Sequence, residues 1–248
     1  MLIDALDYDD TGFPQGAIGP QRKQFETERG RAGVARLVVV SNRVGVPDRG
    51  ARAGGLEVAI RPVLKRRGGV WFGWSGRIAD DPGLAKTVAQ DNTSYVTIDL
   101  RKDDYDEFYN GFANRVLWPI LHYRLDLAEF TRRDLGGYFR VNEYFATQLE
   151  KFLTPDDVVW VHDYHLIPLA KALRERGHKN KIGFFLHVPC PPPEILTALP
   201  NHEQLIPALG QYDPAIAPLS GRHPLPPDLL RRQIPDWETG CLCPAVRA

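Results

Sequence analysis

Cysteine, net charge and long hydrophobic runs are all scarce in this 248-residue chain. Its three cysteines make no disulfide framework, which favours a reducing compartment, and we expect a cytoplasmic protein. The 31 basic and 31 acidic side chains cancel, so no net charge draws the chain to nucleic acid or to an anionic membrane. No apolar run approaches the roughly 18–20 residues that span a bilayer. Residues 1–13 lack the apolar region of a signal peptide.

Composition divides the chain into three zones. Residues 1–35 hold four aspartates between positions 4 and 10, then glycine, proline and charged residues without a regular period, which predicts a flexible extension. Residues 36–213 carry regular hydrophobic patterns and form the predicted domain. In residues 214–248, seven of the 35 residues are proline and none is Phe or Tyr. Such a segment cannot bury enough surface to offset its ordering entropy, so we expect a disordered tail.

The middle zone alternates strand and helix patterns. Continuous apolar runs predict strands at 36–41, 70–74, 95–99, 157–161 and 181–186. Helical periodicity predicts helices that open at 54–55 and over 103–122, 138–152, 167–176, 194–199 and 202–212, the second of them broken or kinked at Pro119. Alternation of this kind indicates an α/β fold with a parallel sheet and helices on both faces.

Ligands of open parallel sheets bind beyond the carboxyl ends of the strands, and Arg43 stands just after the first predicted strand. Gly54 and Gly55 follow at the predicted start of a helix, where backbone N–H groups and the helix dipole favour a phosphate. Arg43 could add a bidentate contact to the same anion. The alternative is a tight turn beside a solvated arginine.

Polar side chains also follow the fourth and fifth strands. Asp163, with His162 and His165 on either side, is placed to hydrogen-bond sugar hydroxyls. A metal site is the poorer interpretation, because no Cys or acidic cluster completes a ligand shell. A third alternative has Asp163 capping the helix that follows. His187 ends the fifth strand, before a proline cluster at 189–193 that suits a rigid pocket wall.

Two aromatic residues of the predicted helix 103–122 are interpreted as core residues rather than as site residues. Tyr109 and Trp118 lie nine residues apart, which is about 2.5 turns of an α-helix and places them on opposite faces. One or both are therefore expected in the core, unless the helix breaks near Pro119. Cys190 carries no local sign of activation, and we interpret it as a packing residue.

The chain contains seven motifs in an order that resembles the trehalose-6-phosphate synthase family. They are VVSNR (39–43), AGGL (53–56), WFGWSG (71–76), VLWP (116–119), HYR (122–124), WVHDYHL (160–166) and GFFLH (183–187). The resemblance covers about residues 36–213. It implies the Rossmann-like, acceptor-binding N-terminal domain of a retaining GT-B glycosyltransferase, whose second domain mainly holds the nucleotide.

The resemblance also implies a reaction and a set of site residues. The family transfers glucose from UDP-glucose to glucose 6-phosphate, giving trehalose 6-phosphate and UDP, and needs neither a metal nor another cofactor. Residues matching acceptor-binding positions are Arg43, Tyr109, Trp118 and Asp163. Gly54 and Gly55 match the loop that meets the donor. The expected catalytic residues are Asp163 and His187, of which His187 matches a histidine close to the transferred sugar.

The sequence departs from the family pattern after Asp213. The family continues with a strand of the type LVGFQ and then with the donor-binding domain, whereas this chain continues with Pro214 and the proline-rich zone. We therefore expect the resemblance to end near residue 213 through a truncation or frameshift, which translation of the other two reading frames after codon 213 would test. Two alternative functions follow: a non-catalytic sugar-phosphate-binding remnant, and a metal-dependent hydrolase built on His162, Asp163, His165 and His187.

Overall fold

The computed structural model describes residues 35–45, 55–188 and 191–213. Most of the expected extension 1–35 lies outside these residues, as do Gly54, Cys190 and the expected tail 214–248. Within the described part of the chain, no helix is long and apolar enough to cross a membrane.

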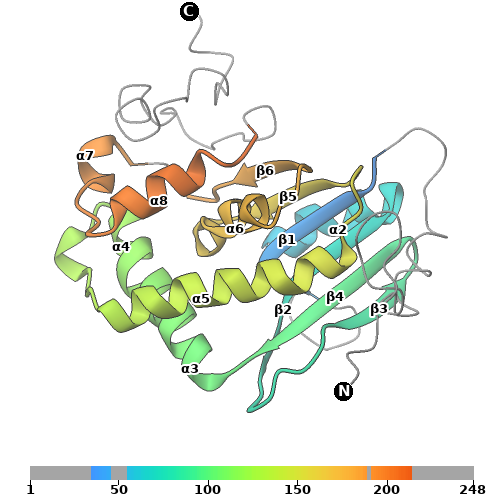
Figure 1. Cartoon of the computed structure of the whole chain (residues 1–248), viewed down its shortest axis with the longest axis horizontal. Coiled ribbons are helices and arrows are strands. Elements are labelled where there is room, and N and C mark those ends of the chain that lie inside the picture. The colour runs from blue at the N-terminus through green and yellow to red at the C-terminus, as the bar shows by residue number, and fades with distance from the viewer. Residues whose placement is uncertain (1–34, 46–54, 189–190, 214–248) are drawn as a thin grey trace, which may run out of the picture. The chain divides into compact units, whose positions relative to one another are not determined.

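The domain is built on one six-stranded sheet (Figure 1). Its strands are β1 (Leu37–Arg43), β2 (Gly69–Ile78), β3 (Lys86–Gln90), β4 (Thr93–Leu100), β5 (Val158–His162) and β6 (Lys181–Phe185), in the order β3-β4-β2-β1-β5-β6. All five expected strands are present and mutually parallel, which confirms that part of the prediction. Strand β1 lies between β2 and β5, so the chain order reverses direction beside it.

The edge strand β3 is absent from the sequence prediction. It runs antiparallel to β4, and all five of its residues are exposed, so no burial pattern marks it in the sequence. The only local signal is the two-residue turn of Asp91 and Asn92, where Asp91 takes a positive φ of 52°. Such a turn between two extended segments is typical of a β-hairpin.

Helices cover both faces of the sheet, as expected. The longer elements are α2 (Gly55–Arg67), the π-helix η1 (Tyr105–Leu117), α5 (Arg132–Leu149), α6 (Leu169–Glu175) and α8 (His202–Leu209). Short ones are α3 (Lys102–Asp104), α4 (Trp118–Leu121), η2 (Leu125–Leu127), η3 (Glu150–Phe152), η4 (Tyr164–Leu166) and α7 (Pro193–Leu196). Figure 1 shows α5 crossing in front of the sheet and α2 behind it.

Each face of the sheet has its own apolar core. Behind the sheet, Ile60 and Leu64 of α2 pack with Trp71 of β2 in one buried cluster. In front, Phe145 of α5 meets Phe72 of β2 edge-on, with ring centroids 5.8 Å apart. Because successive residues of a strand point to opposite faces, the adjacent Trp71 and Phe72 serve the two cores in turn.

The expected single helix over 103–122 is wrong in its geometry. Residues 105–117 form a π-helix, in which each N–H bonds to the carbonyl five residues earlier, as the N–H of Trp118 does to Ala113. Pro119 does not break this helix but stands in the first turn of α4, where its missing N–H costs no hydrogen bond. Helix α5 also begins six residues before the expected start at 138. Its N-cap is Thr131, whose hydroxyl accepts a bond from the N–H of Asp134 at 3.0 Å.

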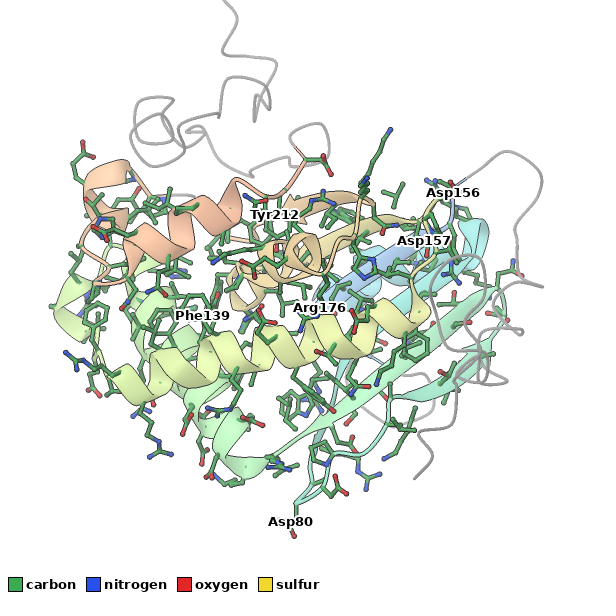
Figure 2. The ribbon with its side chains drawn as sticks, viewed as in Figure 1. Asp80, Phe139, Asp156, Asp157, Arg176 and Tyr212 are labelled. Carbon is green, nitrogen blue, oxygen red and sulfur yellow. The ribbon has the colours of Figure 1, made fainter. Side chains whose placement is uncertain are left out.

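Two polar residues labelled in Figure 2 hold the ends of the β5–β6 region. At its amino end, the buried carboxylate of Asp157 accepts two hydrogen bonds from Arg36, at 2.9 and 2.7 Å. On the side of α8, the buried Tyr212 hydroxyl donates to the carbonyl of Leu166 at 2.7 Å. The Asp157 bonds anchor the end of β5 that lies opposite the candidate site, and the Tyr212 bond holds the segment η4 that follows β5.

Candidate active site

The candidate site lies at the carboxyl ends of β1, β5 and β6. Arg43 is the last residue of β1, Asp163 directly follows β5, and His187 stands two residues beyond β6. The three strands are neighbours and parallel, so their carboxyl ends lie at one edge of the sheet. The reversal of strand order between β1 and β5 is where open α/β sheets place a ligand crevice.

Arg43 is presented by an irregularity at the end of β1. The pairing of β1 with β2 shifts register between Ser41 and Arg43. The Ser41 hydroxyl holds the irregularity, because it donates to the carbonyl of Arg43 and accepts from the indole N–H of Trp71, both at 2.8 Å. The exposed guanidinium then lies over the ring of Trp74, 5.8 Å from its centroid.

Gly76 makes room for that guanidinium. Its φ is 84°, and a Cβ there would lie 2.6 Å from an Nη atom of Arg43. Neither Trp74 nor Gly76 was singled out as a site residue from the sequence. The Trp-Ser-Gly run directly after an apolar strand is the signal that marks them.

Tyr109 is joined to Arg43 through an array of aromatic rings. Its ring centroid lies 6.3 Å from that of Trp74 and 5.4 Å from that of Tyr105, against which it stacks. On another side Tyr109 stacks on His165 at 5.6 Å, with only 13° between the ring planes. Tyr109 is therefore half-buried at the site rather than a member of the core.

Trp118 is 44% exposed, so the expectation that it is a core residue is wrong. The reason is the π-helix: with more than four residues in each turn, nine residues make about two turns rather than 2.5. Tyr109 and Trp118 therefore share one side of the helix. Trp118 stacks on His122 at 4.1 Å, and His122 lies near enough to Asp163 to influence the pKa of its carboxyl.

Asp163 adopts a strained backbone, with φ 76° and ψ 163°. Non-glycine residues held in such regions cluster at active sites and ligand clamps. Its carboxylate accepts from the N–H groups of Tyr164, at 3.0 Å, and of His187, at 3.4 Å. It thus caps the short helix η4, as one of the sequence alternatives expected, and also joins β5 to β6. Burial raises the pKa of this carboxyl.

Buried polar side chains of α5 hold the strained segment in place. The Tyr138 hydroxyl donates to the carbonyl of Tyr164 at 2.6 Å, and the Asn142 amide donates to the carbonyl of His165 at 3.1 Å. Both side chains are fully buried, so α5 fixes the backbone that carries Asp163.

The two remaining histidines near Asp163 are buried beneath the site. His165 packs between the rings of Tyr109 and Tyr164, and burial lowers its pKa to about 3. His162 lies under His187, with Nδ1 of the first 3.1 Å from Nε2 of the second. Within the described residues, no group of three His, Cys, Asp or Glu side chains is arranged to hold a metal ion. The metal-site alternative therefore has no support there.

The expected donor loop is described only at its end. Gly55 is the first residue of α2, as the sequence predicted, while Gly54 lies outside the described residues. The first turn of α2 carries Glu57, which pairs with Arg61 one turn later.

These contacts define a site with a cation at one end and a carboxylate at the other. Arg43 supplies a guanidinium suited to a phosphate, Asp163 supplies acceptors for hydroxyl groups, and aromatic rings line the distance between them. Fold and site together define an α/β, Rossmann-like domain with a candidate ligand site at the carboxyl edge of its parallel strands.

Comparison with known proteins identifies the family. The model of glycosyltransferase family 20 matches residues 42–215, and the chain belongs to this family. A trehalose-6-phosphate synthase of Sinorhizobium fredii is 54% identical over 185 residues, which are 73% of this chain and 40% of the relative. The chain thus spans about two fifths of the length of that relative.

Solved structures of this class share the fold. A UDP-forming α,α-trehalose-phosphate synthase from Burkholderia xenovorans in complex with glucose 6-phosphate matches with a TM-score of 0.67 and 48% identity, over 72% of this chain and 39% of that one. A structure described as trehalose-6-phosphate from E. coli bound with UDP-2-fluoro glucose matches with a TM-score of 0.68 and 50% identity, over the same shares.

Proposed function

We propose that this chain provides the acceptor half of a glucosyltransferase that transfers glucose from UDP-glucose to glucose 6-phosphate, forming trehalose 6-phosphate and UDP. In this assignment Arg43 binds the phosphate, Tyr109 and Trp118 line the acceptor pocket, and Asp163 binds sugar hydroxyls. His187 lies beside the transferred sugar, and Gly54 and Gly55 meet the donor. Asp163 and His187 are the proposed catalytic residues.

The chain of ring contacts that links Arg43 to the neighbourhood of Asp163 carries this proposal. Arg43 lies on Trp74, Trp74 contacts Tyr109, and Tyr109 stacks on His165, which adjoins Asp163. A phosphate carries negative charge and a hexose carries hydroxyl donors, so a ligand with both groups matches the two ends. The glucose 6-phosphate complex of the B. xenovorans relative supports the same ligand.

Calorimetric titration of the 248-residue chain with glucose 6-phosphate tests the acceptor site. Arg43→Ala is expected to weaken binding at least tenfold, because charge-assisted hydrogen bonds contribute about 1.5–3 kcal/mol. The wild type is expected to bind glucose more weakly than glucose 6-phosphate. The affinity for glucose itself is expected to be the same in the wild type and in Arg43→Ala.

Arg66→Ala is the charge-matched control. Arg66 is exposed in the last turn of α2, next to the amino end of β2 and therefore at the edge of the sheet away from the site. Equal loss of affinity in both variants would assign the effect to net charge and overturn the acceptor site.

Release of UDP from UDP-glucose in the presence of glucose 6-phosphate tests the transfer itself. Saturable binding of glucose 6-phosphate without UDP release would assign the chain to sugar-phosphate binding alone, the second candidate function. The specific observation that favours this candidate is that the described residues offer a guanidinium and a carboxylate for a sugar phosphate, while the match covers only 39% of each of these two solved structures.

A further inference from the structure

His162 has a place in the site that the acceptor assignment does not use. It is the last residue of β5 and is only 2% exposed, packed against Trp160 and Phe185 with ring centroids 4.4 and 5.9 Å away. Its Nδ1 lies 3.1 Å from Nε2 of His187, whose ring is exposed at the carboxyl end of β6. One buried imidazole thus supports one exposed imidazole.

His162 is a neutral group at any ordinary pH. Burial, reinforced by the neighbouring His187, lowers the pKa of His162 to about 3. A neutral imidazole carries its single proton on one nitrogen, so the hydrogen bond between the two histidines allows two arrangements. Either His162 donates from Nδ1 to His187, or His187 donates from Nε2 to His162.

The surroundings of Nε2, the other ring nitrogen of His162, show which of the two arrangements is favoured. Its Nε2 is buried and has no hydrogen-bond partner among the residues that the structure describes. If Nε2 carried the proton, the ring would bury an N–H group without an acceptor, which folded proteins almost entirely avoid. If Nδ1 carries the proton, the proton forms a hydrogen bond and only the acceptor Nε2 is left without a partner among the described residues.

We propose that His162 is a positioning residue that donates from Nδ1 to Nε2 of His187, and thereby fixes His187 as a hydrogen-bond donor through Nδ1. With Nε2 accepting, the proton of a neutral His187 sits on Nδ1. The exposed ring then offers an N–H group to an oxygen of the sugar. That this oxygen belongs to a sugar rests on the proposed function. The assignment of the His187 tautomer does not rest on it.

Nitrogen-15 NMR of the imidazole side chains tests the proposal without any substrate. A protonated and a bare ring nitrogen give well-separated resonances, so the spectrum of the 248-residue chain reports both tautomers directly. We expect a proton on Nδ1 and none on Nε2 in His162 and in the neutral form of His187. A proton on Nε2 of either ring would overturn the proposal.

Two substitutions test whether His162 sets the state of His187. His162→Asn keeps an N–H donor close to the position of Nδ1, and His162→Phe keeps the ring but removes the donor. The Asn variant is expected to retain the Nδ1–H form of His187, and the Phe variant to lose it as the main form. Retention in the Phe variant would contradict the positioning role.

The wild-type and Asn spectra decide the question even where the Phe variant fails to fold. The result is also separable from the proposed function. Correct tautomers without glucose 6-phosphate binding would refute the acceptor assignment alone. Binding together with an Nε2–H tautomer would refute the positioning role alone.

Discussion

At the scale of single residues, Gly76 links the backbone of β2 to the orientation of Arg43. A methyl group at this position would collide with the guanidinium of Arg43, which is the flexible end of a long side chain and can move aside. Gly76→Ala is therefore expected to displace Arg43 from Trp74 and to weaken glucose 6-phosphate binding at least tenfold. Calorimetric titration of the folded variant provides the measurement.

Gly83→Ala is the matched control for this change. Gly83 also has a positive φ, of 63°, but a Cβ there would meet nothing within 4 Å. Both substitutions are expected to cost about 1–2 kcal/mol of stability, because the left-handed region is unfavourable for alanine. Only Gly76→Ala should affect binding, and equal affinities in the two variants would show that Arg43 does not depend on this glycine.

At the scale of elements, alanine substitutions at two adjacent glycines of α5 are expected to change stability in opposite directions. A Cβ at Gly137 would lie 2.2 Å from Cβ of Glu107, so α5 and the π-helix can pack this closely only without a side chain there. Gly137→Ala is expected to destabilise the fold by about 1–3 kcal/mol through overpacking. Gly136 is exposed and a Cβ there meets nothing within 4 Å.

Gly136→Ala is therefore expected to stabilise the protein by about 0.5–1 kcal/mol, because alanine is the better helix former. Urea unfolding of the two variants beside the wild type measures both effects. Destabilisation by both changes would mean that α5 does not tolerate alanine here for reasons other than the contact with Glu107.

Buried strands could be predicted from the sequence, whereas an exposed strand could not. Strand β1 is buried on both faces over most of its length, and β5 is buried on one face and half-buried on the other. Both appear as continuous apolar runs, whereas the wholly exposed β3 carries no such pattern. The π-helix could not be predicted either, because its apolar residues were interpreted with the period of an α-helix. That error of period is why Trp118 was expected in the core.

Some residues of the candidate site could likewise be predicted from the sequence, and others could not. Arg43, Asp163 and His187 could be predicted, because topology alone places residues that follow parallel strands at one edge of the sheet. Trp74 and Gly76 could not be, since their role depends on the side-chain path of Arg43. The hydrogen bond between His162 and His187 joins residues 25 positions apart, so no local pattern announces it.

At the scale of the whole molecule, two buried neutral histidines couple folding to pH. Burial lowers the pKa of both His162 and His165 to about 3 in the folded protein, whereas an unfolded histidine has a pKa of about 6.5. Between these values the unfolded chain binds more protons than the folded one. Stability therefore rises with pH in this window and is lost as the pH falls below about 6.5.

Each of these histidines is expected to remove about 1 kcal/mol of unfolding free energy for every pH unit between 6 and 5. His165→Phe keeps the ring stacked between Tyr109 and Tyr164 but cannot be protonated. Urea unfolding of this variant and the wild type should give curves that converge or cross as the pH falls from 7 to 5. Taking the difference between the two proteins cancels the contribution of carboxyl groups, including the opposite one from the raised pKa of Asp163.

The range from pH 7.5 to 8.5 is the internal control, because both states of the protein there hold His165 neutral and the two proteins should differ by a constant free energy. A constant difference that persists down to pH 5 would show that His165 is protonated as readily in the folded protein as in the unfolded one. That result would mean that water reaches the ring beneath Tyr109. The rings of Tyr109 and Tyr164 would then not shield His165 from water, although both stack on it.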